Sequence, residues 1–197
     1  DLLTPVVKAW CTDIAQEVSD LAIQVHGGMG FIEETGVAQF YRDARILPIY
    51  EGTNGIQSSD LVFRKVLRDE GAALNAFLDE LSRIRETSTD SLAERLPELD
   101  AWLGEANGLL DRASRKIYAH NENGDIKALE MASDPFLRLF GTVAGAFMLA
   151  RNAAKVLDCG APAAFGDEIV SHLHFYCRTI LPRARSHYPA IETPLVE

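Results

Sequence analysis

Apolar residues recur at every third or fourth position along almost the whole of this 197-residue chain, and this spacing most constrains its fold. In a helix with about 3.6 residues per turn, this spacing places the apolar residues on one face. No stretch shows the period-two alternation of a strand, and there is no internal repeat or low-complexity tract. The spacing therefore predicts an all-α fold that ends in an up-and-down helical bundle with short loops.

Glycine and proline mark the expected helix ends in the first third of the chain. The first helix should end at Gly27 and Gly28, because glycine caps a last helical turn well. Thr35 is a candidate N-cap for a helix over residues 36–46, which Pro48 interrupts. The apolar face of the first helix comprises Val7, Trp10, Cys11, Ile14, Val18, Leu21, Ala22 and Val25.

A further helix is expected over residues 53–67. The polar stretch at residues 68–74 is the candidate boundary between a first domain, residues 1–70, and a second, antiparallel helical domain, residues 71–197. Separators of turn-like composition occur at residues 87–90, 121–125 and 158–163. The helices between them are expected at residues 72–86, 92–120, 126–157 and 165–185, the third with a candidate break at Asp134 and Pro135.

The charge balance argues against nucleic acid and anionic membranes as partners. Nineteen Lys and Arg against 29 Asp and Glu give a net charge of −10 without a basic stripe. We expect no signal peptide, and the most apolar stretch, residues 141–150, is too short to span a bilayer. The widely spaced Cys11, Cys159 and Cys177 are expected to be reduced, buried thiols. We therefore expect a cytoplasmic protein.

The stretch from Gln24 to Gln57 is chemically unlike the rest of the chain. Within it, Glu51 lies in PIYEGTNG with apolar residues around it in sequence. A carboxylate held among apolar groups is a stronger base than one in water. Gly52 lets the backbone approach a ligand, and an amide N–H before a helix can stabilise developing negative charge. The competing interpretation is a surface glutamate favoured by the helix dipole. The segment HGGMG follows a helix and lacks phosphate-loop spacing, so it indicates a C-cap more than a phosphate site.

The whole stretch resembles the C-terminal helical domain of the flavin-dependent acyl-CoA dehydrogenases. The matching pieces are QVHGGMGF, then EE, then YRDARILPIYEGTNGIQ, and their order and spacing together are specific. The resemblance implies an enzyme that oxidises acyl-CoA thioesters to trans-2-enoyl-CoA with FAD as cofactor. It further implies an electron-transfer flavoprotein as acceptor and a homodimer or homotetramer as the assembly.

The resemblance assigns the catalytic base to Glu51, which would remove the α-proton of the thioester while the flavin takes hydride from the β-carbon. The backbone N–H of this glutamate and a ribityl hydroxyl of the flavin would polarise the thioester carbonyl. Tyr50 and Gly52 would lie against the substrate. Arg42 is expected to be an ion-paired structural residue that positions the Glu51 loop.

Cofactor binding is implied at two further places. Gln24, Gly27 and Gly28 correspond to a QxxGG segment that contacts the ADP part of FAD, usually FAD held mainly by a neighbouring subunit. Thr53 matches a residue near the FAD pyrophosphate. Gly55 stands where the family often has glutamine, so a side-chain contact is not expected there.

The tail resembles the C-terminal extension of larger bacterial members, including the 3-methylmercaptopropionyl-CoA dehydrogenase group. His172 and His174 lie two apart and would diverge on a helix, so no metal site is expected. Arg178, Arg183 and Arg185 are expected on a solvated helix face, with contact to a CoA phosphate as the alternative. We assign this part to packing and subunit assembly. Its core should contain Met131, Phe136, Phe140, Phe147 and Met148.

The family needs an N-terminal helical domain and a β-domain before the point where this sequence starts. The sequence also begins inside a helical pattern and without methionine. We therefore expect the C-terminal fragment of a bacterial enzyme, inactive by itself. The alternative is a helical interaction or regulatory domain of a flavoprotein without turnover, although the acidic balance counts against a DNA-binding version.

Overall fold

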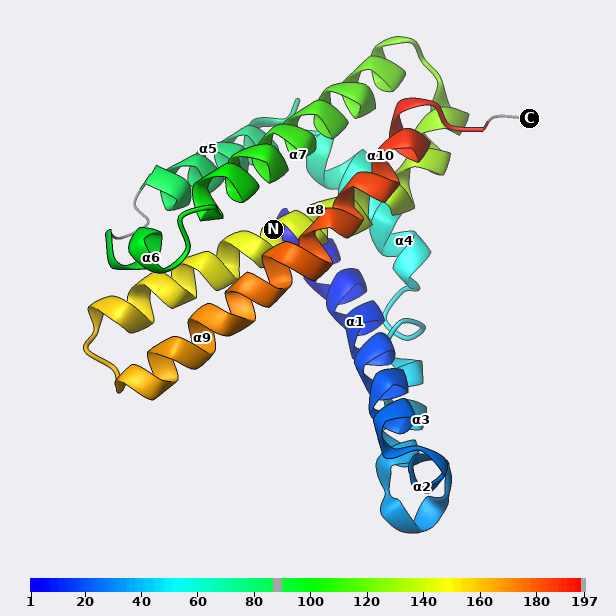
Figure 1. Ribbon diagram of the computed structural model, residues 1–197. Helices are drawn as coiled ribbons and strands as arrows, with labels where there is room; N and C mark the ends of the chain where they lie inside the picture. The colour runs from blue at the N-terminus through cyan, green and yellow to red at the C-terminus, as the bar shows by residue number, and fades with distance from the viewer. Residues whose placement is uncertain (87–89, 196–197) are drawn as a thin grey trace.

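The computed structural model describes residues 1–86 and 90–195, and every regular element within them is helical, as the apolar spacing predicts. Figure 1 shows an arm and a bundle. The arm consists of α1 (Leu3–His26), α2 (Gly28–Phe31) and α3 (Val37–Ile46). α4 (Asn54–Ser59) then leads from the arm back to the bundle (Figure 1). In the described part of the chain, no helix is long and apolar enough to cross a bilayer.

The bundle surrounds α8 (Ile126–Asp158), which contacts α1, α4, α5, α6, α7, α9 and α10. The expected core phenylalanines Phe136, Phe140 and Phe147 are fully buried on α8, whereas Met131 is 54% exposed and was wrongly placed in the core. Phe77 stacks on Phe140 with ring centroids 5.1 Å apart. The elements packed around α8 are α5 (Ala72–Glu86), α6 (Asp90–Arg95), α7 (Leu99–Glu122), α9 (Ala163–Phe175) and α10 (Ala184–Glu192).

Pro97 and Pro135 each lie inside an expected helix, and only one of these two helices is interrupted. The helix expected over residues 92–120 is divided into α6 and α7, because Pro97 disfavours helical backbone at the residue before it. Pro135, by contrast, lies inside an unbroken α8. The carbonyl that loses its helical partner there belongs to Met131, which lies on the exposed side of the helix, so water can replace the missing N–H. Residues 87–89 of the first expected separator lie outside the described residues.

Two helices are less regular than their sequences predict. Residues 53–67 form α4 followed by the π-helical η2 (Asp60–Val66). Residues 165–185 form α9, the π-helical η3 (Tyr176–Ile180), the 3-10 turn η4 (Leu181–Arg183) and the start of α10. Pro182 contributes to this change, because its nitrogen cannot donate to the preceding turn. The apolar spacing alone does not distinguish these helix types.

The short connector expected after Gly28 is itself helical, with α2 followed by the 3-10 turn η1 (Glu33–Thr35). The expected N-cap role of Thr35 is wrong. Its hydroxyl donates to the carbonyls of Met29 and Ile32, at 2.6 and 3.1 Å, and α3 begins instead after Gly36. The glycine end of α1 is confirmed, since Gly27 has φ 59° and its N–H bonds to the Gln24 carbonyl.

α1 crosses α8 at two glycines one turn apart. The Trp10 ring of α1 lies over Gly141, and the Tyr176 ring and the edge of Trp10 lie over Gly145. Trp10 Nε1 donates to Thr142 Oγ1 at 3.3 Å, and the Tyr176 hydroxyl donates to the Thr142 carbonyl at 2.9 Å. A Cβ on either glycine would overlap an aromatic side chain. This crossing therefore fixes the root of the arm on the central helix.

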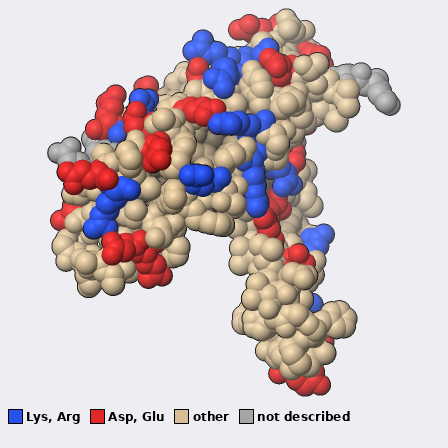
Figure 2. Space-filling model, in the orientation of Figure 1, with Lys and Arg blue, Asp and Glu red and all other residues tan. Residues whose placement is uncertain are grey.

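Much of the apolar surface of the arm is uncovered. The buried residues of α1 are Pro5, Val6, Ala9 and Ser19, so the face expected to be buried is wrong for most of its length. Figure 2 shows an arm with few charged side chains along its side. Cys11 and Cys159 are also exposed, against expectation, while Cys177 is buried. The exposed large apolar residues of the arm and its loop are Val7, Val18, Leu21, Val25, Met29, Phe31, Ile32, Phe40, Ile46, Ile49, Tyr50 and Ile56.

Gly141→Ala should destabilise the chain by about 1–3 kcal/mol, because the new methyl group overpacks the Trp10 contact. Gly108→Ala is the matched control. It lies within α7, where a Cβ would meet only Arg112 at 3.5 Å. That substitution should stabilise by about 0.5–1 kcal/mol through helix propensity. Urea unfolding followed by circular dichroism measures the free energy of unfolding of both variants. Equal stabilisation by the two substitutions would contradict the close contact between Trp10 and Gly141.

Candidate functional site

Glu51 lies in the loop between α3 and α4, where the backbone takes an unusual path. Glu51 has φ 54° and Gly52 has φ 85°, both in the left-handed region. Glycine adopts this conformation freely, but for a residue with a Cβ it costs about 1 kcal/mol. Such a residue persists only where its surroundings hold it, and it is found most often at functional sites. The loop must therefore be anchored by contacts around it.

Two side chains hold the carbonyl groups of this turn. Lys8 Nζ, from α1, donates to the Gly52 carbonyl at 2.7 Å. Gln57 Nε2, from α4, donates to the Glu51 carbonyl at 3.2 Å. Within residues 1–86 and 90–195, the amide N–H groups of Glu51 and Gly52 have no hydrogen-bond acceptor. These two donors remain available to a ligand oxygen.

Asn54 fastens the loop to α1 and, through it, to the bundle. Its Nδ2 donates to the Ala9 carbonyl at 3.1 Å and to Asp13 Oδ1 at 2.7 Å, while its Oδ1 accepts from Lys8 at 2.9 Å. The other oxygen of Asp13 pairs with Arg138 of α8 at 3.1 Å. The loop, the arm and the central helix are thus joined through a single carboxylate.

The residue expected to position the loop does not contact it. Arg42 pairs with Glu33 at 3.2 Å and donates to Gln39 at 2.8 Å, so it is ion-paired as expected but within the arm. Lys8 and Asn54 take the positioning role. Nothing in the sequence signalled it, because Asn54 meets residues of α1 more than forty positions earlier.

Thr53 caps α4, since its Oγ1 accepts from the Ile56 N–H at 3.4 Å.

Tyr50, Glu51, Gly52 and Thr53 are all exposed. The apolar neighbours of Glu51 in sequence do not enclose its carboxylate: they are exposed too, at 53% for Ile46, 46% for Ile49 and 62% for Ile56. The described residues therefore present the glutamate on an open, apolar surface.

The remaining predicted cofactor residues lie at the far end of α1. Gln24, Gly27 and Gly28 are exposed, and a Cβ on either glycine would meet nothing within 4 Å. This open backbone fits the close approach of a bulky ligand. The Nδ1 atom of His26 forms a hydrogen bond with the Ala22 carbonyl of the preceding turn, at 2.8 Å. This contact is consistent with a helix-end role for the histidine.

The two groups of site residues are far apart. Lys8 touches the Glu51 loop, and Gln24 lies sixteen residues further along the same uninterrupted helix. At 1.5 Å per residue, this places about 24 Å of helix between the two groups. The structure therefore brings Tyr50, Glu51, Gly52 and Thr53 together and leaves Gln24, Gly27 and Gly28 at a separate place.

The helical extension after η2 adds no metal-ligand cluster within residues 72–86 and 90–195. No group of three or more histidines, cysteines and carboxylates suitable for a metal ion occurs among the described residues. His174 stacks on Trp102 with ring centroids 5.9 Å apart. Arg183 pairs with Glu17 at 2.6 Å, so this arginine links the bundle to the arm.

Asn54→Ala should loosen the Glu51 loop while the bundle stays intact. Removing the amide takes from Lys8 and Asp13 the part-buried hydrogen-bond partner that they share, which should cost about 1–3 kcal/mol. Hydrogen exchange should accelerate at residues 49–57 and remain unchanged in α8. The matched control is Asn152→Ala on the exposed side of α8, expected to change stability by less than about 0.5 kcal/mol. Unchanged exchange in the loop would show that other contacts hold it.

Two family models together match almost the whole chain. The one described as Acyl-CoA dehydrogenase, C-terminal domain, matches residues 2–65, and the one described as Acetyl-CoA dehydrogenase C-terminal like matches residues 67–194. A solved acyl-CoA dehydrogenase complexed with FAD from Bacillus anthracis aligns with 96% of this chain at a TM-score of 0.74. At 16% sequence identity, that likeness shows the fold alone.

Two curated relatives match along nearly the full chain. The 3-methylmercaptopropionyl-CoA dehydrogenase of Ruegeria pomeroyi is 39% identical over 97% of this chain. The broad-specificity linear acyl-CoA dehydrogenase FadE5 of Mycobacterium tuberculosis is 30% identical over 98% of it. The chain spans 33% of each of these relatives. The protein belongs to the acyl-CoA dehydrogenase family, of which this chain represents the C-terminal helical domain and the helical extension that follows it.

Proposed function

We propose that the protein is an FAD-dependent acyl-CoA dehydrogenase in which Glu51 is the catalytic base. The observation that carries this proposal is the left-handed turn at Glu51 and Gly52, whose carbonyls are held by Gln57 and Lys8 while its amide N–H groups stay free. A strained, well-anchored turn that presents a carboxylate and a free amide side by side suits proton removal next to a carbonyl group.

The chemistry requires both groups at once. An α-proton of a thioester becomes acidic enough for a carboxylate only if negative charge on the carbonyl oxygen is stabilised as the proton leaves. The Glu51 carboxylate would remove the proton, and its backbone N–H would donate to the thioester oxygen. Gly52 has no side chain to obstruct the substrate, and Tyr50 would line its path. FAD, when bound, supplies the acceptor for the β-hydride.

The residues present fit part of an FAD site. The open backbone at Gly27 and Gly28, with Gln24 beside it, would contact the ADP part, and Thr53 would lie near a pyrophosphate. The separation of about 24 Å along α1 supports two different FAD molecules for the two groups, one of them held mainly by a neighbouring subunit. This arrangement calls for a homodimer or homotetramer, and the exposed apolar side chains of the arm offer surface for it.

The acyl group and the electron acceptor are further proposals. The 39% identical relative is named for 3-methylmercaptopropionyl-CoA, so that thioester is the first substrate to test beside straight-chain acyl-CoA. A relative that matches a shorter stretch is named as a subunit of a caffeyl-CoA reductase–Etf complex. This name supports an electron-transfer flavoprotein as the acceptor.

The chain as given should not retain FAD by itself. The Glu51 side chain is exposed, and the neighbouring apolar side chains are open to solvent. The measurement is to add FAD, remove the unbound fraction and record the flavin absorbance that remains. Stoichiometric flavin would mean that these helices alone build a complete cofactor site.

Glu51→Gln should abolish turnover in a protein that joins this chain to the segments preceding it in its relatives. Flavin should remain bound, because the amide has the shape of the carboxylate. Anaerobic reduction of the flavin by acyl-CoA should slow by about a hundredfold or more, the usual contribution of a general base.

Glu34→Gln, which alters an exposed carboxylate outside the Glu51 loop, is the matched control and should leave the rate unchanged. Normal flavin reduction in Glu51→Gln would remove this residue from the role of base. Flavin that is bound but reduced by no acyl-CoA in the unaltered protein would favour a regulatory flavoprotein instead.

A further inference from the structure

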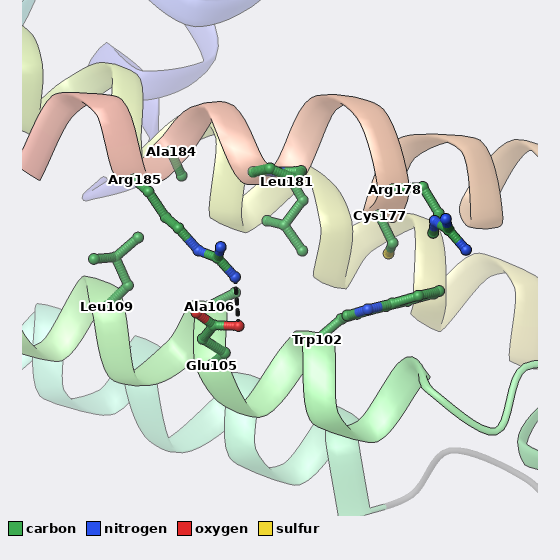
Figure 3. A pocket seen from close by; sticks show the side chains of 10 residues that line it. Trp102, Glu105, Ala106, Leu109, Cys177, Arg178, Leu181, Ala184 and Arg185 are labelled. Atoms are coloured by element: carbon green, nitrogen blue, oxygen red, sulfur yellow. Dashed lines mark hydrogen bonds and ion pairs between the residues drawn. The ribbon is translucent and has the colours of Figure 1, made fainter.

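A cleft in the extension lies apart from the Glu51 loop and from the residues proposed to contact FAD. It opens between α7 on one side and the η3, η4 and α10 segments on the other, and its volume is about 150 Å³. Figure 3 shows Trp102 and Glu105 entering it from α7, and Leu181, Arg178 and Arg185 entering it from the opposite side. The family resemblance assigns no role to this place.

One side of the cleft is formed where the segment between α9 and α10 departs from regular α-helix. η3 is a π-helical turn and η4 is a 3-10 turn that contains Pro182. Four of the residues lining the cleft come from these two irregular turns: Cys177, Arg178, Leu181 and Pro182. A π-helical turn inside a long helix is rare and frequently marks a functional site.

The inner walls of the cleft are apolar. Trp102 forms one wall, and stacking on His174 fixes its ring. Leu109 and Leu181 add aliphatic surface, and both are largely buried. Burial raises the pKa of the Cys177 thiol to about 12, so it stays protonated at neutral pH and serves as one more uncharged wall.

Arg178 lies at the mouth of the cleft and, within residues 1–86 and 90–195, forms no ion pair. Arg185 pairs with Glu105 at 2.6 Å across the cleft, so these two charges compensate each other. Arg178 has no carboxylate within ion-pair distance among the residues that the structure describes. An available guanidinium at the edge of an apolar cleft favours a carboxylate there, because the two groups form charge-assisted hydrogen bonds.

We propose that this cleft binds a small organic carboxylate, with its apolar body against Trp102 and Leu181 and its carboxylate on Arg178. A guanidinium matches the geometry of a carboxylate in a two-point contact. A cavity of about 150 Å³ accepts a body the size of a benzene ring. The ligand class is therefore a short or singly aromatic carboxylate, whose binding does not depend on FAD or on acyl-CoA chemistry.

The test uses benzoate as the charged probe and benzyl alcohol as its neutral counterpart of nearly equal size. The chain contains two tryptophans, so its ¹H–¹⁵N spectrum has two indole resonances, which Trp102→Phe assigns. Benzoate should shift the Trp102 resonance in a saturable way and leave that of Trp10 unchanged. Benzyl alcohol should bind about tenfold more weakly, the factor expected for one charge-assisted contact.

Arg178→Gln should weaken benzoate about tenfold and leave benzyl alcohol unaffected, because only the charge is removed. The exposed Arg178 has no ion pair to lose, so this variant should fold normally. Arg151→Gln on the exposed side of α8 carries the same change of charge and should leave both affinities unchanged. Equal binding of the two probes, binding of neither up to the millimolar range, or unchanged benzoate affinity in Arg178→Gln would each overturn the proposal.

Discussion

The contact between Trp10 and the two glycines of α8 determines where the candidate site lies. Because Gly141 and Gly145 have no side chains, α1 can approach α8 closely enough for the Trp10 ring to rest on its backbone. The anchors of the Glu51 loop lie on the same helix, Lys8 before the tryptophan and Asp13 after it. The loop therefore takes its position from a helix crossing, and its unusual backbone depends on the packing of the central helix.

Periodicity and turn chemistry predicted the helical class, the glycine end of α1 and the interruption at Pro48, because these follow from local backbone preferences. The π-helical turns could not be predicted from the sequence, because apolar residues on one face are compatible with an α-helix and with a π-helix. The contacts of Asn54 could not be predicted either, because they depend on tertiary packing between distant segments. The motif around Glu51 located the loop correctly, but the sequence misassigned the residue that holds it.

The exposed face of α1 shows a second limit of prediction from the sequence. Val18, Leu21 and Val25 have the spacing of a buried stripe, yet more than half of each side chain is exposed. A periodic apolar stripe indicates that a helix face becomes covered; it does not identify the covering partner. The curated relatives are three times as long as this chain, and the candidate cofactor residues lie on the same uncovered arm. Both the apolar stripe and the exposed site residues are what the proposed assembly with protein surface from outside this chain requires.

The continuity of α1 limits how this part of the sequence can diverge. One helix carries both the residues that fix the Glu51 loop and, about 24 Å away, the open backbone around Gly27. Each residue added to or deleted from α1 between these two places would rotate one relative to the other by about 100° about the helix axis. It would also shift one along the axis by about 1.5 Å. Substitutions in α1 preserve this alignment, whereas insertions and deletions destroy it. Insertions and deletions should therefore occur in connectors such as residues 123–125, where neither end of the arm is affected.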